Sequence, residues 1–98
     1  MLCGGTGPSQ AATPEVQEMC NQLKADMEKS CGKSFTVFEV IEVRSQVVAG
    51  TNYFIKIRCG DEEFVHARVF KPLPHTNQPP QLHSCQAPKS KHDELAYF

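Results

Sequence analysis

The sequence lacks long apolar runs, blocks of like charge and a strong net charge. Its ten basic and eleven acidic residues are scattered along the chain and give a formal net charge of -1. Because nucleic-acid-binding proteins usually gather basic residues into a patch or stripe, we expect no nucleic-acid partner. The apolar runs are too short to span a bilayer, so we expect no membrane partner either. A chain of 98 residues has room for one domain, residues 1–98, and little room for a deep catalytic cleft.

The amino terminus also lacks the charged region and the apolar region of a secretory signal peptide. We therefore expect to find the protein in the cytoplasm or the nucleus. Residues 1–12 are mostly glycine, alanine and small polar residues, which cannot anchor a segment to a core. This composition predicts a flexible N-terminal trunk ahead of the folded part of the domain.

The cysteines lack any Cys-x-x-Cys spacing. The chain has five of them, and an odd number cannot pair completely. Since a reducing compartment keeps thiols free, we interpret the cysteines as small apolar residues rather than as a disulfide framework. Cys3 is the exception, because its glycine-rich surroundings predict an exposed thiol that can form an intermolecular disulfide.

Catalytic and metal-binding patterns are also missing. A catalytic cysteine needs a low-pKa thiol held against a histidine, and no local signature of that kind occurs, so we do not expect an enzyme. His83, Cys85 and Cys31 are candidate metal ligands, yet the paired spacings typical of zinc sites are absent. We therefore predict no catalytic residue, no metal site and no cofactor.

What the sequence does contain begins with an amphipathic helix. Thr13 is suited to the N-cap, and Pro14 is suited to the first helical position. Apolar residues then recur at spacings of three and four along one helical face: Val16, Met19, Cys20, Leu23 and Met27. Gly32 is suited to a left-handed stop. These features predict one helix of about four to five turns.

After the helix the period of the apolar residues changes to two. The segments 35–44, 52–59 and 64–70 predict strands, and a slip at residues 39–42 predicts a β-bulge in the first of them. Four prolines make residues 71–80 a loop, and a weaker, more polar strand follows at 82–87. Short connections favour an antiparallel meander. The predicted fold class is α+β, with one N-terminal helix packed on a curved antiparallel β-sheet.

Three consecutive apolar residues break the alternation between the first two strands, in the run Gln46-Val47-Val48-Ala49-Gly50. In a continuing strand these side chains would be buried. The glycine and the amphipathic neighbours favour instead an exposed tip of a hairpin. An exposed apolar tip is typical of a docking surface or of an aggregation-prone edge.

This run matches the pattern Gln-x-Val-x-Gly, and the whole chain resembles the stefins, the type 1 branch of the cystatin family. The resemblance rests on Gly4 in the trunk, on Gln46 to Gly50, on Leu73-Pro74-His75 and on the tail ending in Tyr97-Phe98. It implies a cystatin-like fold. It also implies reversible, tight-binding, non-covalent inhibition of papain-like cysteine proteases such as the lysosomal cathepsins, without a cofactor.

The resemblance further implies a three-part wedge that fills the active-site cleft of the protease. Its parts are the trunk around Gly4, the hairpin residues Gln46, Val47, Val48, Ala49 and Gly50, and the loop residues Leu73, Pro74 and His75. The alternative is a non-inhibitory interaction module with the cystatin fold, which shares every structural expectation and differs only at the wedge.

The same hairpin bears on the oligomeric state. A tip that joins two long strands could open and exchange between chains, with the hinge at residues 47–50. We expect a monomer, with a domain-swapped dimer or a dimer linked through Cys3 as the alternatives.

Overall fold

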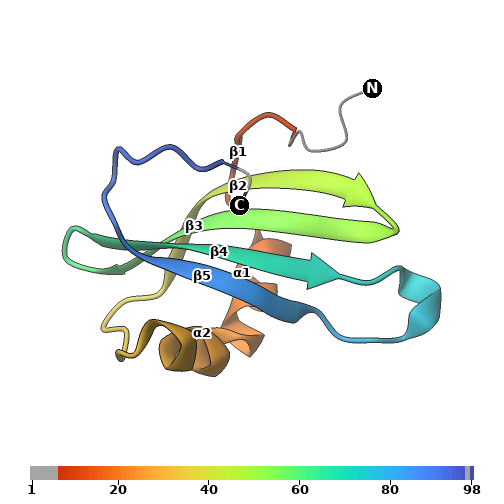
Figure 1. Ribbon diagram of the computed structural model, residues 1–98, viewed down its shortest axis with the longest axis horizontal. Helices are drawn as coiled ribbons and strands as arrows, with labels where there is room; N and C mark the ends of the chain where they lie inside the picture. Colours follow the sequence, from red (N-terminus) through yellow and green to blue (C-terminus); the bar gives the residue numbers. More distant parts are fainter. Residues whose placement is uncertain (1–6, 97) are drawn as a thin grey trace.

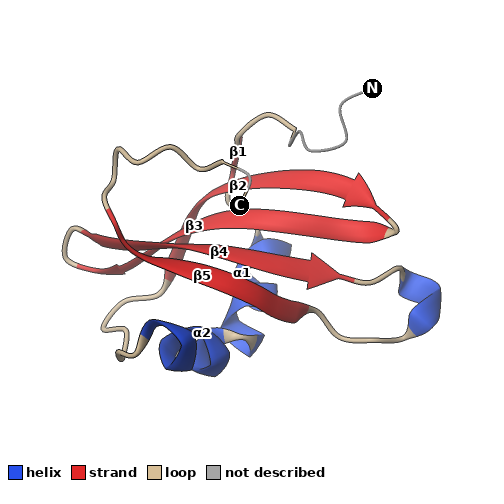
Figure 2. Cartoon of the chain, in the orientation of Figure 1, coloured by secondary structure: helices blue, strands red, loops and turns tan. Residues whose placement is uncertain are grey.

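The structure, a computed structural model, describes residues 7–96 and residue 98. Its elements follow the chain in this order: β1 (Gln10–Ala11), α1 (Pro14–Gln22), α2 (Lys24–Cys31), β2 (Glu39–Val48), β3 (Gly50–Gly60), β4 (Glu63–Lys71), the 3-10 helix η1 (Pro74–Thr76) and β5 (Gln81–Lys89). The strands form one antiparallel sheet in the order β1-β2-β3-β4-β5. Both helices lie on the same face of this sheet (Figures 1 and 2). The α+β fold class is confirmed.

The helical region begins as predicted and is interrupted once. The Thr13 side chain accepts a hydrogen bond from the backbone N–H of Val16 at 3.2 Å, and Gly32 ends α2 in the left-handed conformation. The break lies at Leu23, whose φ of -105° and ψ of 6° leave the helical region. Its N–H bonds instead to the Cys20 carbonyl, in a tighter turn. Because the Leu23 side chain stays buried with the apolar stripe, the sequence period does not reveal this break.

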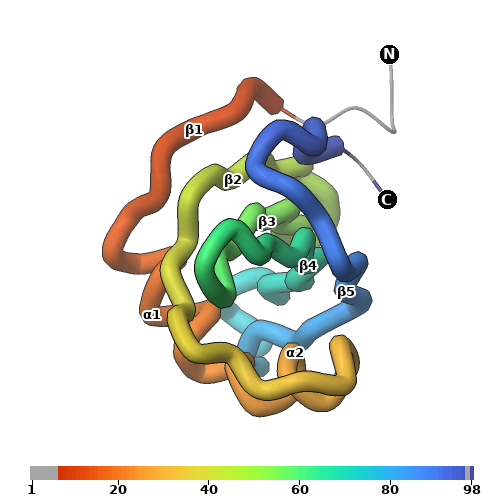
Figure 3. Tube along the Cα trace, turned by 90° about the vertical axis from the view of Figure 1, so that its left-hand side faces the viewer, coloured from red at the N-terminus to blue at the C-terminus, as the bar shows by residue number. Residues whose placement is uncertain are grey.

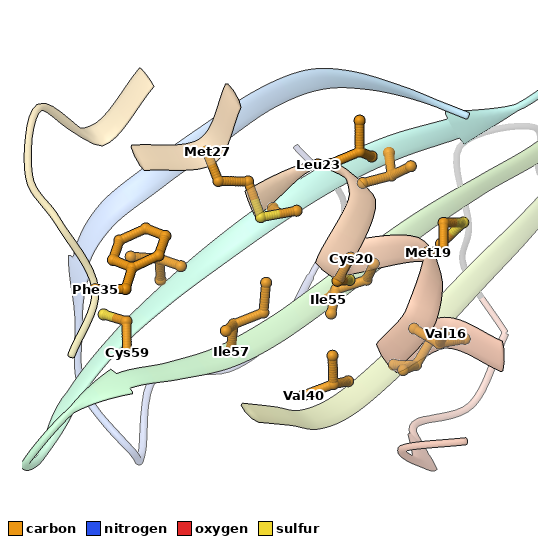
Figure 4. Packing of buried hydrophobic residues seen from close by; sticks show 14 residues of the cluster. Val16, Met19, Cys20, Leu23, Met27, Phe35, Val40, Ile55, Ile57 and Cys59 are labelled. Atoms are coloured by element: carbon orange, nitrogen blue, oxygen red, sulfur yellow. The ribbon is translucent and has the colours of Figure 1, made fainter. Parts of the chain in front are cut away.

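The core lies between the helices and the sheet (Figure 4). Burial of these apolar side chains stabilises the fold by about 1.5–3 kcal/mol each. The cluster includes the following residues: Val16, Met19, Cys20, Leu23, Met27, Phe35, Val40, Val43, Ile55, Ile57, Cys59, Val65, Ala67 and Val69.

The predicted bulge is present, because the β2–β3 register shifts between Val40 and Glu42 and leaves Ile41 exposed.

The C-terminal tail covers the other face of the sheet, opposite the helices (Figure 3). Lys56 on β3 donates hydrogen bonds to the backbone carbonyls of Lys91 at 3.0 Å and Asp93 at 2.6 Å. Arg44 donates to the carbonyl of Leu95, whose side chain is fully buried. The tail is therefore part of the folded structure, held through its backbone by basic side chains of β2 and β3.

Part of the predicted flexible trunk also belongs to the sheet. Gln10 and Ala11 form β1 and pair with Val43 and Glu42 of β2. Residues 1–6 lie outside the described residues. A strand of one glutamine and one alanine is too short to show an alternation of apolar and polar residues, which is why the composition of the trunk did not indicate it.

The first long strand begins later than expected, at Glu39 rather than at Phe35. The N–H of Phe35 bonds to the Glu28 carboxylate of α2 at 2.8 Å. The next two N–H groups, of Thr36 and Val37, both point to the Cys59 carbonyl of β3 at 3.2 and 3.4 Å, so a regular ladder does not start here. The Phe35 ring is buried and stacks on Phe38 at 5.7 Å between centroids.

In the described part of the chain, no helix is long and apolar enough to cross a membrane.

Candidate functional site

The tip of the β2–β3 hairpin carries the apolar run. Val48 pairs with Gly50, which leaves Ala49 at the turn itself. Val47 is 82% exposed and Val48 is 46% exposed, so the run is presented to solvent as predicted and does not continue a buried strand. Two branched apolar side chains at the end of a hairpin form a small surface that a partner can cover.

Gly50 is required at this turn for two separate reasons. Its φ of +121° is a conformation that residues with side chains rarely adopt. A β-carbon at this position would lie 2.7 Å from the Lys71 carbonyl oxygen and 2.8 Å from the ring of Phe70. The glycine therefore lets the hairpin close against the end of β4.

A buried polar pair lies directly behind the tip. The Asn52 side-chain amide donates a hydrogen bond to the Gln46 side-chain oxygen at 3.1 Å, and both side chains are less than a tenth exposed. The two residues also face each other in the strand register. Gln46 thus braces the hairpin from inside, whereas the valines form its surface. Asn52 was missed in the sequence, where a lone asparagine near a turn carries no distinct signal.

The segment Leu73-Pro74-His75 forms a second, ordered tip. The Thr76 backbone N–H and hydroxyl both donate to the Leu73 carbonyl, at 3.1 and 2.7 Å, and close the short helix η1. Asn77 ends this helix in the left-handed conformation. The Leu73 side chain is 39% exposed, and Pro74 and His75 are exposed as well. The predicted loop is therefore not irregular throughout, because one 3-10 turn fixes its shape.

The two tips lie at the same end of the sheet (Figure 1). The register pairs Thr51, just after the hairpin tip, with Lys71, just before the second tip. Strands β3 and β4 therefore carry Val47, Val48 and Leu73 to one edge of the molecule. The structure brings together these sequence-predicted residues, which are far apart in the chain.

The described part of the trunk points toward the same edge. The Gly7 N–H donates to the Ser45 carbonyl at 2.8 Å, and Arg44 donates to the Gly7 carbonyl at 2.9 Å. Because β1 is antiparallel to β2, the chain ahead of β1 runs alongside β2 toward the hairpin tip. Gly4, the predicted trunk contact, and Cys3, the predicted disulfide site, both lie outside the described residues.

The titratable groups in and beside the core are poorly suited to catalysis. Burial raises the pKa of Cys20 to about 12, and burial together with neighbouring thiols raises the pKa of Cys85 to about 12. A cysteine nucleophile needs the opposite shift. Burial and the positive charges of Lys56 and Lys89 lower the pKa of His66 to about 4. Within residues 7–96 and residue 98, no three His, Cys, Asp or Glu side chains are grouped as a metal site.

Comparison with known proteins relates this geometry to a family. Residues 4–92 match the family model of the Cystatin domain. Cystatin-B of the macaque Macaca fuscata fuscata is 52% identical to the chain, cystatin-B of Homo sapiens is 51% identical, and cystatin-B of Bos taurus is 49% identical. Each alignment spans 98 residues and covers all of both chains. The similarity therefore extends over both tips and the tail.

Proposed function

The chain belongs to the cystatin family, whose members are inhibitors of cysteine proteases and not enzymes, and from this premise we propose that it blocks the active-site cleft of papain-like cysteine proteases, the lysosomal cathepsins among them. One observation carries the proposal. The two exposed apolar tips, Val47-Val48 and Leu73, extend from the same end of the sheet. A narrow edge with two apolar tips suits a cleft better than it suits a flat partner.

Hydrophobic burial of the hairpin tip supplies much of the binding energy in this proposal. A valine moved from water into an apolar cleft contributes about 1.5–3 kcal/mol when it becomes fully buried. Val47 is almost entirely exposed, so it has the most area to lose on binding. The side chains of both tips are hydrocarbon or imidazole groups, and none is an electrophile. Binding is therefore reversible and non-covalent.

Preorganisation makes this binding efficient. The hydrogen bonds from Thr76 to the Leu73 carbonyl hold the second tip in shape before a partner binds. The hydrogen-bonded pair Gln46–Asn52 holds the first tip in the same way. Residues already ordered in the free protein lose less conformational freedom on association. We expect an interface of about 800 Å² on each partner, the size common to tight protease–inhibitor complexes.

The trunk around Gly4 is the third part of the proposed wedge. The direction of the chain at Gly7, alongside β2 toward the hairpin tip, supports this role. A glycine lets a backbone pass close to the catalytic centre in conformations that other residues resist. We propose that the protein acts in the cytoplasm or the nucleus.

Titration of papain or a cathepsin of known active-site concentration tests the inhibitor proposal. The expected result is stoichiometric loss of protease activity, recovered after dilution or competition with substrate. Full protease activity at micromolar inhibitor would instead favour the alternative, a cystatin-fold module that interacts with other partners.

For the oligomeric state we propose a monomer that can exchange its N-terminal half through the hinge at residues 47–50. The test is size-exclusion chromatography after mild heating in reductant. A dimer that persists in reductant and has lost inhibition supports exchange through the hairpin tip. A dimer that dissociates in reductant points to Cys3, and a monomer throughout rejects the exchange.

A further inference from the structure

Four cysteines lie within the described residues, and all four are free thiols: Cys20, Cys31, Cys59 and Cys85. Two of them are buried, whereas Cys31 and Cys85 are only partly buried. Cys31 is the last residue of α2, and Cys85 lies on β5, the strand that α2 contacts (Figures 1 and 3). Both pack against the edge of the same core. Two partly accessible thiols therefore come together where the helix covers the sheet.

Cys31 and Cys85 lie at the same contact between α2 and β5. Burial is the largest cause of the raised pKa of Cys85, and the neighbouring Cys31 thiol is the next. Cys31 also borders Ala87, Pro88 and Lys89, which follow Cys85 on β5, so the two thiols lie in the same region of the contact between α2 and β5. Side chains that meet in this way from two packed elements can be linked with little movement of the backbone.

Cys31 also borders a surface pocket. The pocket has a volume of ≈ 340 Å³, with Lys33, Pro88 and Lys89 among the surrounding residues. This volume is within the range of pockets that take small molecules. Glu62 and Glu63 line the same pocket and balance the charge of the two lysines, and Lys33 pairs with Glu63 at 2.8 Å. A small oxidant would therefore meet Cys31 first.

We propose that Cys31 and Cys85 form a reversible redox-modification site, in which a small disulfide such as oxidised glutathione links them to each other. Cys31 releases its proton, and its sulfur attacks one sulfur of the reagent, forming a mixed disulfide and expelling one glutathione thiolate. Because burial raises the pKa of Cys85, the loss of its proton is the slow step; its sulfur then attacks the Cys31 sulfur and expels the second thiolate. Both leaving thiolates take up protons. The protein is thus oxidised by two electrons, and the reagent is reduced to two molecules of glutathione.

The bond would connect parts of the chain on opposite sides of the hairpin tip. Cys31 precedes the run Gln46 to Gly50, and Cys85 follows it, so the bond ties α2 to β5 and closes a long loop. A disulfide that closes a long loop restricts the unfolded chain and raises the thermal midpoint. Neither cysteine belongs to the two exposed tips. Inhibition of papain is therefore expected to persist in the oxidised monomer.

The test uses the Cys3→Ser variant, so that the terminal thiol cannot link two chains. The reduced protein is incubated with defined ratios of oxidised to reduced glutathione and then examined by intact-mass and peptide mass spectrometry. We expect a monomer lighter by two hydrogens, a linked peptide pair containing Cys31 and Cys85, and a thermal midpoint higher by about 10 °C or more. Reduction should reverse all three changes.

Matched serine variants distinguish this pair from the neighbouring thiols. The linked product should be lost in Cys31→Ser and in Cys85→Ser and kept in Cys20→Ser and Cys59→Ser, with folding of each variant checked by circular dichroism. A link that involves Cys20 or Cys59, glutathione adducts without a link, or unchanged thiols at every ratio would each overturn the proposal. None of these readouts depends on protease inhibition.

Discussion

The two ends of the sheet present opposite surfaces, although a tight hairpin closes each of them. At one end the β2–β3 tip exposes Val47 and Val48, and the neighbouring loop exposes Leu73. At the other end the β3–β4 turn exposes Asp61 and Glu62, as well as the adjacent Glu63. Charged side chains at the end of a sheet discourage association with other chains. The difference supports the proposal that the apolar end is the surface that binds the protease.

The two ends also differ in how they are held. The apolar end depends on Gly50, where a side chain would meet close neighbours in a strained backbone conformation, and on a buried amide pair, Gln46 and Asn52. The charged end depends on exposed ion pairs, of which Lys33–Glu63 at 2.8 Å is the shortest that the structure records. Exposed ion pairs contribute little to stability. Substitutions at the two ends should therefore have unequal effects.

The largest effect is expected from Gly50→Val. The side chain would clash with the Lys71 carbonyl and with Phe70 in a backbone conformation that valine resists. We expect a loss of about 2–4 kcal/mol in the free energy of unfolding, together with weaker inhibition. Urea unfolding measures the loss. The control is Gly32→Ala, where φ is also positive but the space is open, with a cost of about 1 kcal/mol.

The buried histidine of β4 predicts a pH dependence at a distance from the tips. The pKa of His66 is lowered to about 4 by burial and by the charges of Lys56 and Lys89. As the pH falls, His66 is therefore protonated in the unfolded chain at a higher pH than in the folded protein. The contribution of the neutral His66 side chain to the free energy of unfolding is complete above pH 6.5 and is lost as the pH falls from 6.5 to about 4. We expect a decrease of about 2–3 kcal/mol across this range.

Urea unfolding at a series of pH values measures this decrease, and His66→Gln should flatten it. His83→Gln is the matched control, because that side chain is exposed on β5. Stability that falls equally in both variants would assign the pH dependence to other groups.

A smaller effect is expected from Asn52→Ala behind the tip. The substitution removes the hydrogen bond to Gln46 and should lower the free energy of unfolding by about 1 kcal/mol. It should also weaken inhibition, because the tip loses part of its support. A double-mutant cycle with Gln46→Ala isolates the pair, and additive losses would show that the two side chains are not coupled.

The smallest effect is expected from Lys33→Ala at the charged end. Both side chains of its ion pair with Glu63 are well exposed, and such pairs are screened by water and salt. The unfolding midpoint and the inhibition of papain should both stay close to those of the parent protein. A marked change in inhibition would contradict the functional difference between the two ends.

The sequence predicted those features that depend on local pattern. The cap at Thr13, the stop at Gly32 and the bulge beside Ile41 each follow from a residue type or from a slip in period. The exposed hairpin tip followed from Gly50 and its neighbours. In each of these cases a short stretch of chain contains the physical cause of the structure.

Features that depend on distant partners were not predicted. Strand β1 pairs through its backbone, the break at Leu23 leaves the apolar stripe intact, and Phe35 is tied to α2 rather than to a strand. Burial of Gln46 follows from its cross-strand partner Asn52, which the five-residue run alone does not include. The tail is held by basic side chains of β2 and β3, a contact between distant parts of the chain.

The central claim is that the apolar end of the sheet binds the protease, and the most direct test compares one substitution at each end of strand β2. Val47→Asp places a charge on the exposed tip, and Ile41→Asp places the same charge on an exposed apolar residue at the far end of the strand. The inhibition constant of each variant is measured against papain. We predict an inhibition constant about 10- to 100-fold higher for Val47→Asp and an unchanged one for Ile41→Asp. Equal inhibition constants for the two variants would contradict the claim.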